Sequence, residues 1–398
     1  MDEAPELGAG RYRDLFGEKP KVDIFLRHLK RVSAICRDRD LKPMLWSDMF
    51  FRLSPKPHYP HWKVPAKVAL AIPKDVDLVY WDYYHCETEA YESWFKRHRR
   101  LGFEPIMAGG LRMWATLWVN YPLALAVTDV CLRACKANGV RRAFLTLWGD
   151  DGHECDVFAA LAGLQFFAEH GYADVVDPAR LRAQFRSICG ADYDDWIAAS
   201  GLDAVPGIPH PEQSKANPSK CLLWQDPLLF WYDPQLEGRI LDGHYERLAR
   251  RLDQAARRSP GARLLALPAQ VARVAALKGA FTRKLGQAYL RRNRTALAGL
   301  LKTDLPRLRR QLDRLWRLHR ARWLATCKPF GWEAIELRYG FVRARLDTAA
   351  LRLREYLGAK IPAIPELEEE RHKVYPVELG GLSSLWFKRV CSPSASRT

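Results

Sequence analysis

Residues 142–154 read RAFLTLWGDDGHE, an apolar run that ends in a tryptophan, two glycines and three carboxylates. The apolar part, Arg142 to Trp148, predicts a short buried strand, and the polar part predicts the loop that follows it. Two earlier apolar runs end in the same way, with LWSD at 45–48 and VYWDYYH at 79–85. Carboxylates and indoles that gather at strand ends are the side chains that a sugar-binding pocket needs.

Strands and helices alternate over the first 175 residues. The apolar spacing predicts strands at 41–46, 76–81, 103–107 and 142–148, and helices at 21–39, 87–101, 123–138 and 155–170. Continuous apolar strands that are each followed by a helix indicate parallel βα units, in which the sheet is buried on both faces.

Units of this kind place functional residues at the carboxyl ends of the strands, both in a βα barrel and in an open doubly wound sheet. A doubly wound sheet uses only the two strand ends at its switch point. Here every strand end carries polar or glycine-rich residues, including Ala108-Gly109-Gly110 after the third strand. The sequence therefore favours a barrel.

The second half of the chain has a different pattern. Residues 176–240 are mixed, and four prolines between Val205 and Pro218 predict an ordered crossing loop. From 241 the sequence is rich in arginine, with the 3.6-residue apolar spacing of a helical bundle. We therefore expect four regions: a partial barrel at 1–175, a connecting region packed on it at 176–240, a helical domain at 241–390 and a disordered tail at 391–398.

The composition is that of a globular protein, with 398 residues of which 48% are hydrophobic and 27% are charged. The net charge is +17, and much of it comes from arginines on the helices of the second half. We interpret these arginines as a solvated face and expect no nucleic-acid partner and no membrane partner. Nine scattered cysteines without a Cys-x-x-Cys pair favour reduced thiols, a cytoplasmic location, no metal site and no cofactor.

The strand ends resemble those of one known family. The matching stretches are an Asp-Glu pair at 2–3, KPMLWSD at 42–48, DLVYWDYYH at 77–85, AGG at 108–110 and WGDDGHE at 148–154. Their order and spacing resemble glycoside hydrolase family 20, the exo-acting β-N-acetylhexosaminidases, in the bacterial branch with a helical C-terminal domain. The resemblance implies an α/β fold, namely the C-terminal part of a (β/α)8 TIM barrel (strands 4/5 to 8) followed by an all-α domain.

The resemblance also implies a mechanism. In this family the 2-acetamido oxygen of the substrate attacks the anomeric carbon, so the enzyme needs no nucleophile. Glu3 would be the general acid and later the general base, and Asp2 would hold the acetamido N–H and orient its oxygen. An ionised Asp2 would raise the pKa of Glu3 and keep it protonated near neutral pH. Without the resemblance, the pair is a solvated chain end.

The resemblance implies that Trp46, Trp81 and Trp148 line the pocket around the N-acetyl group and stack on the sugar ring. Their alternative is a role in the core that caps the barrel. Asp150 would accept hydrogen bonds from the 4- and 6-hydroxyls of the sugar, and its alternative is to orient the loop. Asp151 and Glu154 are expected either to orient loops or to cap the helix that begins near Cys155.

Four further residues lie close to these. Tyr83 is a candidate donor to the acetamido carbonyl, and Tyr84 is an equal rival because the strand phase does not separate them. Asp48 is expected either to orient Trp46 or to contact the sugar. We expect His85 and His153 to be surface or supporting groups rather than catalysts.

Two features depart from the family pattern. After Gly110 the family usually has a Trp two residues on and a second Trp two further; here Arg112 takes the first place and Trp114 the second. We keep Trp114 as a substrate-binding candidate and expect Arg112 to change the wall of the pocket. The chain also supplies fewer strands than an eight-stranded barrel of about 200–250 residues needs. We expect Met1 to be an internal methionine of a longer product; a decayed gene or a half barrel completed by another chain are the alternatives.

The sequence thus predicts a glycoside hydrolase that removes terminal β-linked N-acetylhexosamine from glycans or glycoconjugates, with an activity that truncation could abolish. An inactive remnant that binds carbohydrate is one alternative. The other is an interaction module, in which the basic helices of 241–324 dock a nucleic acid or an acidic partner.

Overall fold

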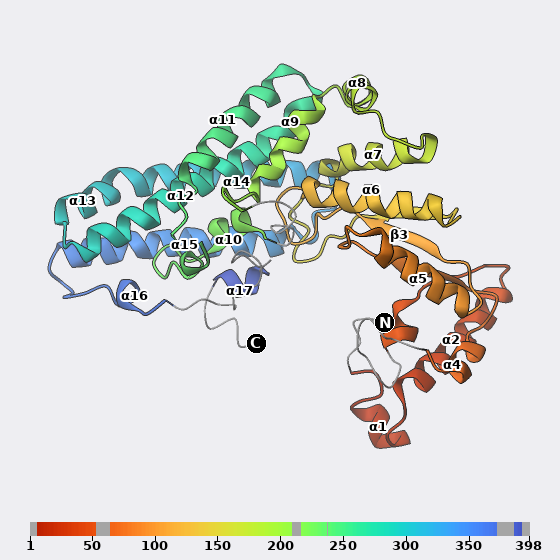
Figure 1. Cartoon of the computed structure of the whole chain (residues 1–398). Coiled ribbons are helices and arrows are strands. Elements are labelled where there is room, and N and C mark those ends of the chain that lie inside the picture. The colour runs from red at the N-terminus through yellow and green to blue at the C-terminus, as the bar shows by residue number, and fades with distance from the viewer. Residues whose placement is uncertain (1–5, 53–63, 209–215, 237, 372–385, 392–398) are drawn as a thin grey trace. The chain divides into compact units, whose positions relative to one another are not determined.

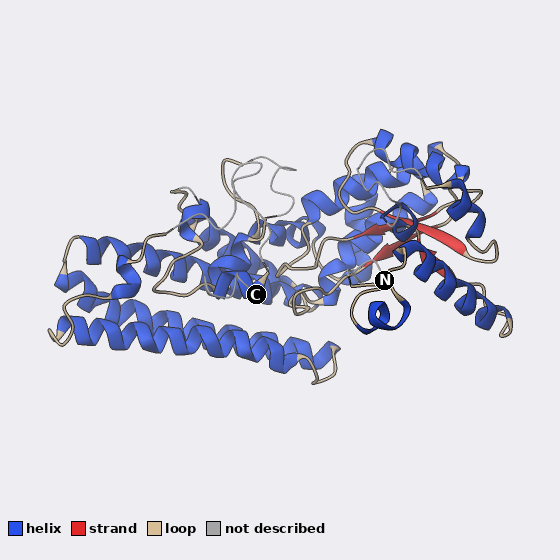
Figure 2. Ribbon diagram, turned by 90° about the horizontal axis from the view of Figure 1, so that it is seen from below, coloured by secondary structure: helices blue, strands red, loops and turns tan. Residues whose placement is uncertain are grey.

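The computed structural model describes residues 6–52, 64–208, 216–236, 238–371 and 386–391. The chain forms two compact units. The first comprises residues 1–110 and 126–146, and the second comprises residues 111–125 and 147–398. It is a mostly helical α/β fold with a small parallel sheet and a C-terminal helical domain (Figures 1 and 2).

The first unit contains a four-stranded parallel sheet whose strands lie in chain order, β1-β2-β3-β4. Figure 2 draws the strands in red. Residue pairs that lie opposite each other include Trp46 and Val79, Trp81 and Ala108, and Gly110 and Thr146. The strands are β1 (Met44–Trp46), β2 (Asp77–Trp81), β3 (Ile106–Gly110) and β4 (Ala143–Thr146). The four predicted βα units are therefore present.

One face of this sheet is covered by helices. Leu78, Tyr80 and Met107 from the strands join a single large core with side chains from five helices. These helices are α2 (Lys21–Arg37), α3 (Asp48–Arg52), α4 (Ala66–Ala71), α5 (Thr88–Arg100) and α6 (Tyr121–Ala137); α1 (Arg11–Phe16) has no buried residue. The strands thus lie in chain order, with these helices packed on one face of the sheet.

The other face of the sheet carries a smaller apolar cluster. Val79, Ile106 and Ala108 are buried, and Trp46, Trp81 and Phe144 pack against them half-buried. In a closed barrel this face points to the interior. The four strands within the described residues do not make a closed eight-stranded barrel.

Several predicted boundaries were wrong. β1 begins at Met44 rather than Leu41, and β4 ends at Thr146 rather than Trp148. The third strand begins at Ile106, not Phe103, because the backbone N–H of Phe103 still bonds the carbonyl of His98 at the end of α5. The predicted helix at 155–170 is a 3-10 turn, η1 (Val157–Ala160), followed by α7 (Leu161–Tyr172), so Gly171 lies inside the last turn.

The second unit is almost entirely helical (Figure 1). The 3-10 and π-helical turns are η2 (Ala199–Leu202), η3 (Asp233–Leu236), η4 (Gly261–Leu265) and η5 (Leu300–Asp304). The α-helices after α7 are α8 (Pro178–Cys189), α9 (Tyr193–Ala198), α10 (Pro218–Trp224), α11 (Asp242–Arg258), α12 (Ala266–Leu290), α13 (Arg294–Gly299), α14 (Leu305–Thr326), α15 (Trp332–Leu357), α16 (Pro365–Glu368) and α17 (Phe387–Cys391).

The centre of this unit is α12, against which α10, α11 and α14 pack (Figure 1). The stretch Gly261–Leu290 is long and apolar enough to cross a membrane by length and composition, but 72% of its apolar window is buried inside the unit. Burial of this kind is typical of the core helix of a helical domain.

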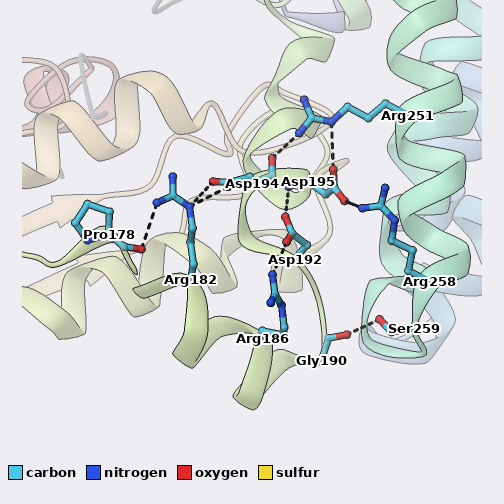
Figure 3. A network of polar contacts seen from close by, with 10 residues as sticks. All are labelled: Pro178, Arg182, Arg186, Gly190, Asp192, Asp194, Asp195, Arg251, Arg258 and Ser259. Atoms are coloured by element: carbon cyan, nitrogen blue, oxygen red, sulfur yellow. Dashed lines mark hydrogen bonds and ion pairs between the residues drawn. The ribbon is translucent and has the colours of Figure 1, made fainter. Parts of the chain in front are cut away.

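Ion pairs join α8, α9 and α11 at one edge of the second unit (Figure 3). Asp195 on α9 is 6% exposed and accepts hydrogen bonds from Arg251 and Arg258, both on α11. On the same edge Arg182 and Arg186 of α8 bind Asp194 and Asp192. Exposed pairs of this kind contribute little individually, so the buried carboxylate of Asp195 is the part of the network that fixes the helices.

Candidate active site

The carboxyl ends of β1 and β2 carry the first two predicted tryptophans. Trp46 ends β1 and Trp81 ends β2, and parallel strands bring their carboxyl ends to the same edge of a sheet. The ring of Trp46 lies 6.1 Å from that of Phe144, and the ring of Trp81 stacks on Tyr83 at 5.1 Å. The structure therefore brings Trp81 and Tyr83 into contact, as a half-buried aromatic surface.

Gly110 makes room for the ring of Tyr83. A Cβ atom at Gly110 would lie 2.6 Å from Cδ1 of Tyr83 and 3.0 Å from Oγ1 of Thr146, closer than such atoms approach. Tyr83 is 7% exposed, whereas Tyr84 is 40% exposed. The two tyrosines that the sequence left as equals thus differ, because Tyr83 is fixed between Trp81 and the end of β3.

Asp82 is a buried acid for which the sequence predicted no role. It is 5% exposed, and its carboxylate accepts hydrogen bonds from the hydroxyl of Tyr80 (2.6 Å) and from the backbone N–H groups of Tyr84 (3.0 Å) and His85 (3.1 Å). Its Oδ2 also lies 2.6 Å from Nδ1 of His85. Burial raises the pKa of Asp82, but its hydrogen bonds with His85 and Tyr80 lower it, and the net pKa is lowered. Asp82 therefore holds the turn that presents Tyr83.

The end of β1 is fixed by the residue after Trp46. Ser47 donates its hydroxyl to the carbonyl of Val79 (2.9 Å), and its Oγ lies 2.7 Å from Nε2 of His98. Burial lowers the pKa of His98 to about 4, so this imidazole is neutral at pH 7. Asp48, the next residue, begins α3 and is half-buried.

The remaining predicted residues belong to the second unit. Trp148 is 38% exposed and Asp150 is exposed. The backbone carbonyl of Asp150 accepts a hydrogen bond from the N–H of Ala115 at 3.2 Å, which joins the loop after β4 to residues 111–125. Trp114 is 7% exposed, and the guanidinium of Arg112 lies 5.4 Å from the centre of its ring.

The loop after β4 has an unusual backbone. Asp151, Gly152 and His153 all have positive φ angles, of 57°, 98° and 54°. A Cβ atom at Gly152 would also lie 2.7 Å from Nη2 of Arg338. Glycine is therefore required at 152 both for its backbone conformation and for the close approach of Arg338.

A buried network of four charges holds this loop. The ammonium of Lys220 on α10 lies 2.5 Å from Oδ2 of Asp151 and 2.7 Å from Oε2 of Glu154. The guanidinium of Arg338 on α15 lies 3.2 Å from Oδ1 of Asp151 and 3.0 Å from Oε1 of Glu154. Burial raises the pKa of Glu154, but Lys220 and Arg338 lower it, and the net pKa is lowered. Asp151 and Glu154 therefore orient the loop, which was one of their two predicted roles.

The predicted capping role for these acids was wrong. The N-terminal cap of η1 is Asp156, whose side chain accepts from the N–H of Phe158 at 2.9 Å. Asp156 also pairs with Arg322 of α14 at 2.9 Å. Asp156 was missed, although an Asp directly before the first helical turn is an ordinary N-cap signal.

The predicted catalytic pair, Asp2 and Glu3, lies outside the described residues, as does the tail at 392–398; Cys391 is the last residue of α17. Of the other predicted residues, Trp46, Asp48, Trp81 and Tyr83 belong to the first unit, and Trp114, Trp148 and Asp150 belong to the second. Within the described ranges, no group of three or more His, Cys, Asp or Glu side chains could hold a metal ion.

Two of the comparisons with known proteins support no family assignment. The comparison with curated proteins found no match. Among solved structures, the chain is similar to one described as a "GH138 enzyme targeting pectin rhamnogalacturonan II", at 11% identity and a TM-score of 0.41. That match covers 89% of this chain and 50% of the other, so the chain spans half the length of that protein, and a likeness this weak supports no conclusion about fold or activity.

The family comparison is more specific. Residues 194–383 match the model of the Glycoside Hydrolase 20C C-terminal domain. The matched region lies within the second unit and includes α10 and α15, which carry Lys220 and Arg338. Through this domain the chain is related to glycoside hydrolase family 20.

Proposed function

We propose that the chain is a β-N-acetylhexosaminidase, which removes terminal β-linked N-acetylhexosamine from glycans or glycoconjugates with retention of configuration. The observation that carries the proposal is the match of residues 194–383 to the C-terminal domain of a family 20 glycoside hydrolase. The strand ends support it, because Trp46 and Trp81 end neighbouring parallel strands and Trp148 with Asp150 follows the last strand.

The proposed reaction has two steps. Asp2 accepts a hydrogen bond from the acetamido N–H and orients the amide, whose oxygen attacks the anomeric carbon while Glu3 protonates the departing glycosidic oxygen. The amide proton either passes to Asp2, which gives a neutral oxazoline, or stays on the nitrogen of an oxazolinium ion paired with Asp2. In the first case Asp2 returns the proton when the ring opens. Glu3, now a carboxylate, takes a proton from water, which opens the ring and regenerates the acetamido group and the retained hemiacetal.

The indoles provide the binding surface. Trp46, Trp81 and Trp148 stack on the apolar C–H face of the sugar and enclose its N-acetyl group. Tyr83 donates to the acetamido carbonyl, a role that fits its fixed position against Trp81. Trp114 completes the wall.

Two carboxylates serve the outer part of the sugar. Asp150 is exposed and directly precedes Asp151, which the buried charges hold in place, so its carboxylate is positioned to accept from the 4- and 6-hydroxyls. Asp48 begins α3 directly after the end of β1 and either orients Trp46 or contacts the sugar.

The test is hydrolysis of chromogenic N-acetyl-β-glucosaminide and N-acetyl-β-galactosaminide by the purified chain. We expect Glu3→Gln to lower kcat about 10²-fold or more, and Asp2→Asn to lower it by a similar factor. Glu6→Gln is the matched control, because Glu6 is an exposed acid three residues after Glu3 in the sequence and should have no effect. Equal rates for Glu3→Gln and the wild-type chain would overturn the assignment.

The second candidate is carbohydrate binding without turnover. The exposure of Trp148 and Asp150 favours it, because an accessible indole and carboxylate can hold a sugar whether or not the acid pair is competent. Quenching of tryptophan fluorescence by N-acetylglucosamine, lost in Trp148→Ala, together with no detectable hydrolysis would select this candidate over the enzyme.

A further inference from the structure

One face of α14 carries five exposed arginines: Arg307, Arg310, Arg314, Arg317 and Arg320. We call them the arginine stripe. They recur at intervals of three and four residues, so they share one side of the helix. The stripe is about 20 Å long, since it spans 13 residues at about 1.5 Å each. The opposite side is buried in the helical domain through Leu305, Leu308, Leu312, Leu315, His319 and Trp323.

The other arginines of α14 behave differently. Arg309 pairs with Asp347 of α15 and with Asp313, and Arg322 pairs with Asp156. For the arginine stripe, no ion pair with a carboxylate occurs among the residues that the structure describes. The helix thus separates structural arginines, which are neutralised, from a row of cations that is not.

The unneutralised charges of the arginine stripe repel one another and so destabilise α14. Each arginine of the stripe lies three or four residues from the next one, so the stripe contains four successive like-charge pairs at i,i+3 or i,i+4. Such pairs oppose helix formation, and a solvated helix face usually carries both signs of charge. A bound polyanion removes the repulsion, which gives the surface a driving force for association beyond the direct contacts.

We propose that the arginine stripe binds a linear acidic polysaccharide, a chain with regularly repeated carboxylate or sulfate groups, lengthwise along α14. Each guanidinium can hold a carboxylate or sulfate through two parallel hydrogen bonds, and all five positions use arginine rather than lysine. Trp316, the tryptophan between Arg314 and Arg317 in the sequence, is already engaged: the guanidinium of Arg343 lies 4.7 Å from the centre of its ring, and its Nε1 donates to Glu336. It is therefore not a free platform on which the bases of a single-stranded nucleic acid could stack. This proposal rests on the proposed function in one respect, namely that the partner is a glycan.

The experiment measures binding of the full chain to polygalacturonate and to heparin as carboxylate and sulfate probes, with neutral dextran as the blank, at several salt concentrations. The test variant is Arg310→Gln/Arg314→Gln/Arg317→Gln. The matched control is Arg247→Gln/Arg250→Gln/Arg257→Gln, which removes the same charge from exposed arginines of α11.

We expect at least one acidic glycan to bind, the stripe variant to bind it about tenfold or more weakly near 100 mM salt, and the control to bind within about threefold of wild type. The thermal midpoint of the stripe variant should equal or exceed that of wild type at low salt, because the repulsion is gone. That readout separates lost binding from misfolding.

Three results would overturn the proposal. One is equal weakening in both triple variants, which would mean attraction by net charge alone. Another is no binding to either glycan. The last is stripe-dependent binding of DNA of similar length that is tighter than binding of either glycan, which would make the partner a nucleic acid. Glu3→Gln should bind the acidic glycans as wild type does. The binding measurement can therefore be interpreted even if the catalytic assignment of Glu3 fails.

Discussion

The ammonium of Lys220 lies 2.7 Å from the carboxylate of Glu154, and neither side chain is exposed to solvent. Lys220 comes from α10 and Glu154 from the loop after β4. Together with Asp151 and Arg338 they form two anions and two cations that neutralise one another away from water. Removing one member leaves an uncompensated buried charge, which is far less favourable than an exposed one.

We therefore predict that Lys220→Met destabilises the second unit by about 3–5 kcal/mol. Arg338 alone would then face both carboxylates. Urea unfolding at pH 7, followed by the fluorescence of the buried tryptophans, measures the effect. Lys302→Met removes an exposed lysine and should change stability by less than about 0.5 kcal/mol, so a similar small change for Lys220→Met would contradict the prediction.

Gly152→Ala should destabilise the protein by about 1–3 kcal/mol, because it places a Cβ in a left-handed conformation and against Arg338. It should also weaken sugar binding, since Asp150 lies two residues away on the same loop. Gly340→Ala is the matched control: it lies inside α15 with open space around its Cβ position, and should stabilise by about 0.5–1 kcal/mol. The two differences in unfolding free energy should have opposite signs.

Asp203 gives a prediction about pH. It is 4% exposed, and burial raises its pKa to about 6, although hydrogen bonds from Ser219 oppose the shift. A raised carboxyl pKa favours the folded state while the group is protonated, below about pH 4, and this contribution is lost as the pH rises through 6.

The stability of Asp203→Asn relative to wild type should consequently improve by about 2–3 kcal/mol between pH 4 and pH 7. Chemical unfolding at a series of pH values measures this slope, and a constant offset from the new amide does not affect it. Asp174→Asn, at an exposed position, should show no such trend. A pH-independent difference for Asp203→Asn would mean that this carboxyl is not the titrating group.

The two adjacent tyrosines can be separated by activity. Tyr83→Phe should lower kcat/KM about 10²-fold, because its ring is held by Trp81 and Gly110 and its hydroxyl is thus preorganised to donate. Tyr84→Phe, at a 40% exposed position, should stay within about threefold of wild type. Steady-state kinetics on the chromogenic glycoside decides, and the reverse order would assign the donor role to Tyr84.

The βα pattern was readable in the sequence because it is local. Each strand is a continuous apolar run and each helix has a 3.6-residue period, so all four units were predicted. The third strand was misplaced because Phe103 is as apolar as the strand itself. Only the bond from its N–H to His98 shows that it closes α5.

The supports of the site were less predictable. Lys220 and Arg338 contact Asp151 across 69 and 187 positions of sequence, and a single basic residue in a helix carries no signal of such a partner. Asp82 could have been found, because its partners Tyr80 and His85 lie two and three residues away. In the WDYYH stretch, roles were predicted for the aromatic side chains Trp81, Tyr83 and Tyr84, but none was predicted for Asp82.

The charge network also says where this polypeptide can be divided. A chimera that joins the helical half to another barrel at residue 175 would separate Asp151 and Glu154 from Lys220 and Arg338. Buried charged groups on both sides of the junction would then lack their partners. A junction before Leu147 keeps all four together and coincides with the start of the longer segment of the second unit. Exchange of this domain between relatives, in the laboratory or by recombination, should therefore succeed only when the WGDDGHE loop travels with the helices.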